Sequence, residues 1–137
     1  MVRSVLPPAR KLIVPILAIH LVLAAVSFAT LALTKSLPVK SALIVAVLLF
    51  LVIAPVSAAV TLLMARLPDP RLPEAVVRTA CRRPGYLFGA FTGAILGVHY
   101  WGTPGAIAMG LGLLAAGWLL GDRIGAFFWA QLQRQPR

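Results

Sequence analysis

The chain has 137 residues, of which 61% are apolar and only 12% are charged. Soluble globular proteins are about half apolar and about a quarter charged, and so short a chain has too little interior to bury the excess. The composition excludes a soluble enzyme and a disordered tail, and the single cysteine, Cys81, excludes a disulfide scaffold. Lipid is therefore the expected surrounding of most side chains.

Four apolar runs follow one another along the chain, and we expect each to be a transmembrane helix. They cover about residues 12–33, 41–64, 86–101 and 104–121. The first two are long enough for a hydrocarbon core of about 30 Å, and the shorter pair fits a thinner bilayer or an upright orientation. The first also exceeds the apolar core of a signal peptide, which indicates a retained helix. The sequence thus predicts an all-α multi-pass membrane protein, in which one domain over 1–137 holds four helices as two hairpins.

Basic residues flank these runs without interrupting them. The chain has thirteen Lys and Arg against three Asp and Glu, a formal charge of +10. With four spans, eleven bases fall on the side of the termini and of the 65–84 loop, and two fall on the other side. The positive-inside rule predicts that both termini and this basic loop are cytoplasmic, in the inner membrane of a bacterium. Residues 122–133 are too short and polar to span, so we expect an interfacial segment there.

The charge also indicates which partners to expect. Five arginines of the 65–84 loop are candidate contacts for anionic lipid headgroups, namely Arg66, Arg71, Arg78, Arg82 and Arg83. Nucleic acid is not an expected partner, because modules that read its grooves are absent. The loop is either a solvated connector or a short surface helix that begins near Pro73 and ends before Pro84. At the end of the fourth run, Asp122 is expected to pair with Arg82 or Arg83.

All eleven glycines lie at or after Gly85. Two sets recur every four residues, and we assign them to close helix packing: Gly85, Gly89, Gly93 and Gly97, then Gly117, Gly121 and Gly125. Residues four apart share one helix face, and small side chains let backbones approach closely in lipid. The short turn between the third and fourth runs predicts an antiparallel hairpin in which the two glycine faces meet. The alternative is that the Gly85–Gly97 face receives a helix from another subunit.

His20 stands near the middle of the first run, and an ionisable group in a membrane is a functional candidate by default. We therefore propose His20 and Thr92 as a candidate intramembrane polar site, against the alternative of a neutral histidine bonded to a hydroxyl or carbonyl. No metal, cofactor or catalytic residue is predicted. A haem between His20 and His99 is not expected, because their depths differ by roughly 9 Å. Pro55 predicts a kink in the second helix.

The spans lack acidic groups, the loops are short and the glycine faces suit tight contacts. These features favour a non-catalytic accessory, assembly or stabilising subunit of a larger membrane complex, in a hetero- or homo-oligomer. The alternative is a small oligomeric transporter or channel with His20 and the Pro55 kink in its pathway. A lipid-modifying enzyme is a third possibility, favoured only by the basic loop.

Overall fold

The structure is a computed structural model that describes residues 9–64 and 72–134. These residues form three α-helices, α1 (Ala9–Leu33), α2 (Val39–Met64) and α3 (Leu72–Arg134), and no strand. Each helix is long and apolar enough to cross a membrane. The all-helical class is thereby confirmed for the described residues, and its helices could cross a membrane, but there are three such helices where the sequence predicted four.

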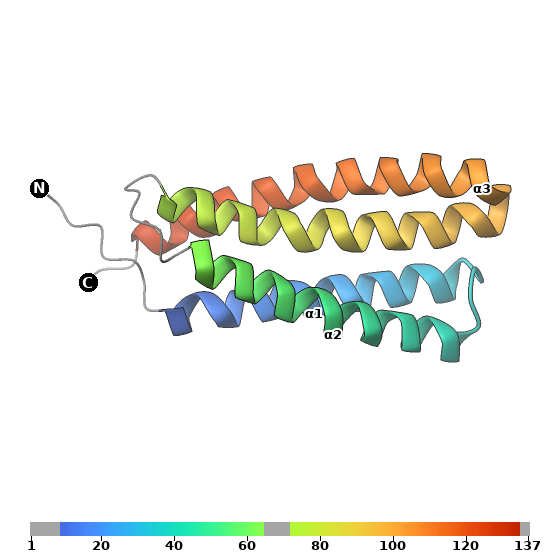
Figure 1. The fold of residues 1–137 in the computed structure, drawn as a ribbon, viewed down its shortest axis with the longest axis horizontal. Helices are drawn as coiled ribbons and strands as arrows, with labels where there is room; N and C mark the ends of the chain where they lie inside the picture. The colour runs from blue at the N-terminus through green and yellow to red at the C-terminus, as the bar shows by residue number, and fades with distance from the viewer. Residues whose placement is uncertain (1–8, 65–71, 135–137) are drawn as a thin grey trace, which may run out of the picture.

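The third and fourth predicted helices belong to one element, α3, which is bent at Gly102. This glycine has φ 66° and ψ −155°, a region that only glycine occupies without a steric penalty. Figure 1 shows that α3 folds back on itself, so that its first arm, residues 72–101, runs beside its second arm, residues 103–134. The chain reverses direction at a single residue, and no separate loop is needed.

The sequence predicted a loop over residues 65–84, and this prediction is wrong for residues 72–84. Helix α3 begins at Leu72 and continues through Pro84, so residues 72–84 form neither a connector nor a short separate helix. A proline inside a helix lowers its stability by roughly 3 kcal/mol. The sequence analysis therefore predicted that a helix would end before Pro84. In the fold Pro84 is fully buried, and its packing offsets that cost. Residues 65–71, with Arg66 and Arg71, lie outside the described residues.

The remaining bounds differ in smaller ways. The predicted interfacial segment over 122–133 is a direct continuation of the second arm, which reaches Arg134. Helix α2 runs through Pro55 as one element. Between α1 and α2, Lys35 adopts a positive φ of 55°, and the Leu37 N–H donates to the Leu31 carbonyl at 3.3 Å. This turn closes the end of α1 and reverses the chain.

The core lies where the three helices meet. The buried face of α1 repeats every three or four residues, as Ile16, His20, Ala24, Ser27 and Leu31. Ala24 packs in one cluster with Ile53 of α2 and Phe88 of α3. At the end of the bundle where α1 and α3 begin, Ile16 packs with Val77 and Ala80 of α3.

The outer faces of the bundle are apolar. On α2 the exposed side chains include Leu43, Ile44, Val47, Leu48, Leu51 and Val52. Exposing such a surface to water is unfavourable, whereas contact with the hydrocarbon of a bilayer carries no such penalty in free energy. The exterior therefore agrees with the length and composition of the helices.

Candidate functional site

Both glycine rows lie at the contact between the two arms of α3, and they meet each other at Gly85 and Gly117. A Cβ added to Gly85 would lie within 3.0 Å of the Gly117 backbone, and one added to Gly89 would lie as close to the Leu113 backbone. Gly93 is opposite Met109 in the same way. The obstructing atoms belong to backbone and cannot rotate away, so hydrogen is the side chain that this spacing permits.

The same contact, which we call the glycine seam, extends beyond the predicted spans at one end and reaches the bend at the other. Gly121 approaches Cys81, Gly125 approaches Arg78, and Gly97 meets Gly105 next to the bend. Gly105 was not among the predicted packing residues, because it has no partner at a spacing of four in its own arm. The second arm covers the Gly85–Gly97 face, which leaves that face no room for a helix of another subunit.

An ionic cluster joins the two arms of α3 away from the bend at Gly102. Arg78 donates from Nε to Oδ1 of Asp122 at 3.0 Å and from Nη2 to Oδ2 at 2.7 Å. Arg82 donates from Nε to the same Oδ1 at 2.6 Å, and its Nη2 also pairs with that oxygen. We call Arg78, Arg82 and Asp122 the basal clasp. The pairing with Arg82 was expected, whereas Arg78 was not expected as a partner of Asp122.

The clasp also fixes the orientation of Arg82. The guanidinium carbon of this side chain lies 5.1 Å from the centre of the Trp118 ring, one turn before Asp122 on the second arm. Stacking on an aromatic face and two hydrogen bonds to one carboxylate hold the planar group in place. Two of the five arginines predicted as lipid contacts therefore have a carboxylate partner within the chain.

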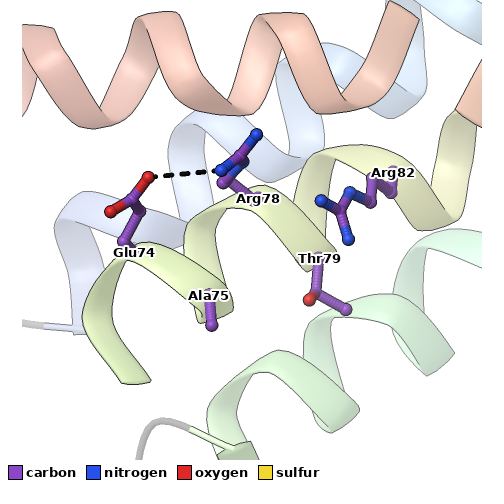
Figure 2. A pocket seen from close by; sticks show the side chains of 5 residues that line it. All are labelled: Glu74, Ala75, Arg78, Thr79 and Arg82. Atoms are coloured by element: carbon purple, nitrogen blue, oxygen red, sulfur yellow. Dashed lines mark hydrogen bonds and ion pairs between the residues drawn. The ribbon is translucent and has the colours of Figure 1, made fainter. Parts of the chain in front are cut away.

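A polar pocket of about 260 Å³ opens beside the clasp on the first arm. It is lined by Glu74, Ala75, Arg78, Thr79 and Arg82, which Figure 2 shows on consecutive turns of the helix. Nη1 of Arg78 contacts Oε1 of Glu74 at 3.4 Å, which is a long and exposed pairing. Surface pairs of this kind contribute little to stability.

His20 and Thr92 are both buried, but they make separate hydrogen bonds. Nδ1 of His20 lies 2.6 Å from the Ile16 carbonyl oxygen, so it carries the proton and Nε2 is an acceptor. Nε2 is buried without a hydrogen-bond partner, and so is Oγ of Ser57. Thr92 instead donates to Oγ of Ser27 at 2.8 Å, a bond from the first arm of α3 to α1.

An apolar groove of about 370 Å³ runs between α1 and the two arms of α3. One wall consists of α1 side chains that include Ile19, Val22 and Val26, and the floor includes Gly85, Gly117 and Gly121. The same glycines that allow the two arms to meet therefore leave a narrow recess beside their contact. This groove was not predicted, because its two walls come from distant parts of the chain.

Comparison with known protein families, with curated proteins and with solved structures gives no match. Within residues 9–64 and 72–134, no three His, Cys, Asp or Glu side chains gather as a set of metal ligands. The glycine seam, the clasp with its pocket, the buried polar groups and the apolar groove are the features from which function is inferred.

Proposed function

We propose that each arm of α3 crosses the bilayer, so that the chain makes four crossings with both termini on the cytoplasmic side of a bacterial inner membrane. In Figure 1 the start of α1, the end of α2 and both ends of α3 lie at one end of the bundle. That end carries the clasp, and in the sequence eleven of the thirteen bases precede the first apolar run, separate the second run from the third or follow the fourth. This asymmetry supports the orientation under the positive-inside rule. Cysteine-accessibility labelling at Lys35 and at Arg123 tests it, since the two positions should react from opposite sides.

We infer that the protein is a non-catalytic accessory, assembly or stabilising subunit of a larger membrane complex. The observation that carries this inference is the apolar groove. Its floor of glycine backbone lets a transmembrane helix of a partner subunit approach closely, which is how helices associate where lipid removes the hydrophobic drive. The glycine rows themselves are occupied within the chain, so we assign the partner helix to the groove beside them.

The test compares two tryptophan substitutions in the full chain. Val22 lines the groove and is exposed, so Val22→Trp fills it, whereas Leu48→Trp adds the same bulk to the exposed face of α2. After gentle extraction, native mass spectrometry should find the unsubstituted chain in an assembly of fixed stoichiometry. Val22→Trp should release the chain, and Leu48→Trp should leave the assembly intact. A chain that is stable alone and moves a solute in liposomes would refute the proposal.

A small oligomeric transporter or channel is the second candidate, and the free acceptor Nε2 of His20 favours it. In such a protein His20 would bind a proton or a polar solute during passage. The Pro55 position supports it less, because this proline is exposed on the outer face of α2. The test is to measure solute flux through liposomes that contain the His20→Ala variant. Unchanged flux would exclude His20 as the transport site.

A further inference from the structure

The pocket beside the basal clasp is lined by Arg78, Thr79 and Arg82 together with Glu74 and Ala75. We propose that it binds the phosphate of an anionic phospholipid headgroup, with Arg82 and Thr79 as donors. This inference rests on the proposed placement of the clasp at the cytoplasmic interface, and it does not depend on a partner subunit.

The first argument is an inventory of hydrogen-bond donors. A guanidinium has five N–H groups, and Arg82 uses its Nε and Nη2 on Asp122. Its Nη1 has no hydrogen-bond partner among the described residues, and the same holds for the hydroxyl of Thr79. Figure 2 shows the Arg82 guanidinium next to the Thr79 side chain, and both line the pocket. A phosphate oxygen in the pocket would give both groups an acceptor.

The second argument is charge. Arg78 and Arg82 share one carboxylate, Asp122, so the clasp keeps an excess positive charge. Glu74 compensates it weakly, because its carboxylate is half exposed and lies 3.4 Å from Arg78. A phosphodiester carries one negative charge and would complete the neutralisation. Charge-assisted bonds from arginine to phosphate are among the strong hydrogen bonds of proteins.

The third argument is position, and it selects a lipid as the source of the phosphate. The pocket lies on the first arm just before the uncharged run that starts near residue 86. Trp118, which stacks on Arg82, is itself partly exposed, and tryptophan favours the level of the headgroups. A phospholipid whose chains lie along the apolar exterior would therefore present its phosphate at the height of Arg82.

Binding is measured on the isolated full chain in neutral detergent, by native mass spectrometry during titration with phosphatidylglycerol or phosphatidylcholine. Thr79→Val removes a donor without touching the clasp, and we expect its affinity for phosphatidylglycerol to fall about 5-fold. Arg82→Gln should lower that affinity at least about 10-fold. Arg123→Gln is the matched control, because it removes the same charge from an exposed side chain that does not line the pocket. It should change the affinity less than about 2-fold.

Three results would overturn the proposal. Equal losses in Arg82→Gln and Arg123→Gln would mean attraction by surface charge alone. Unchanged binding in Thr79→Val would remove the pocket from the interaction, even if Arg82→Gln fails to fold. Displacement of phosphatidylglycerol by equimolar inorganic phosphate would show that the pocket takes a free anion and not a lipid. None of these results bears on the partner subunit, which is tested separately through Val22.

Discussion

Replacing Gly89 by alanine tests the glycine seam directly. The new Cβ would lie within 3.0 Å of the Leu113 carbonyl group, whereas ordinary contact begins at 3.4 Å. Since both obstructing atoms are backbone, the two arms must separate by about 1 Å at this level, and overpacking of this kind costs roughly 1–3 kcal/mol. The separation would also loosen the neighbouring contacts at Gly85 and Gly93, which lie one turn away on either side.

Gly112→Ala is the matched control, because a Cβ at Gly112 would meet nothing within 4 Å. Both substitutions lie in α3 and gain the same helix propensity, up to about 1 kcal/mol. Their difference therefore isolates the seam, and we expect Gly89→Ala to be less stable than Gly112→Ala by about 1–3 kcal/mol. Reversible unfolding in mixed micelles, followed by tryptophan fluorescence, measures this difference. Equal stability of the two variants would refute the close approach of the arms.

Further predictions use the same unfolding assay. Gly102→Ala meets no steric obstacle, yet it should lower the free energy of unfolding by about 1–3 kcal/mol because its φ is positive. Asp122→Asn should destabilise the chain by leaving two guanidiniums without a carboxylate, and added salt should reduce the difference from the unsubstituted chain. A double-mutant cycle of Ser27→Ala and Thr92→Val should give a coupling of about 0.6 kcal/mol, and additive effects would contradict the bond between them. Ser57→Ala should be neutral or stabilising, because the hydroxyl is buried without a partner.

The glycine rows show how far sequence reasoning reaches in this fold. A spacing of four residues in Gly85–Gly97, followed by a very short turn, was sufficient to predict an antiparallel contact. The gap between the third and fourth runs placed the turn at residues 102–103, but the sequence did not show that the two helices join through one glycine with a positive φ. The seam was predictable because periodicity is local, whereas the groove beside it depends on where α1 packs.

Proline was the main source of error. Pro84 was taken as the end of a connector or of a short helix, and Asp122 was expected to pair with Arg82 or Arg83 but not with Arg78. In the structure α3 continues through Pro84, which puts Arg78 and Arg82 one turn apart on the same side of the helix. Local propensity disfavours that continuation, and in the fold the proline is fully buried. The polar site was also only partly foreseen, because His20 and Thr92 bond to different groups.

The hydroxyl pair of Ser27 and Thr92 has a consequence for how the chain is made. Helix α1 leaves the ribosome well before α3, so a nascent chain inserts Ser27 while Thr92 has not yet been synthesised. During that interval the inward side of the first hairpin, including His20, would face hydrocarbon or the insertion machinery. In a chain whose helices cross a membrane, α1 would therefore gain this hydrogen bond only after the first arm of α3 has packed against it.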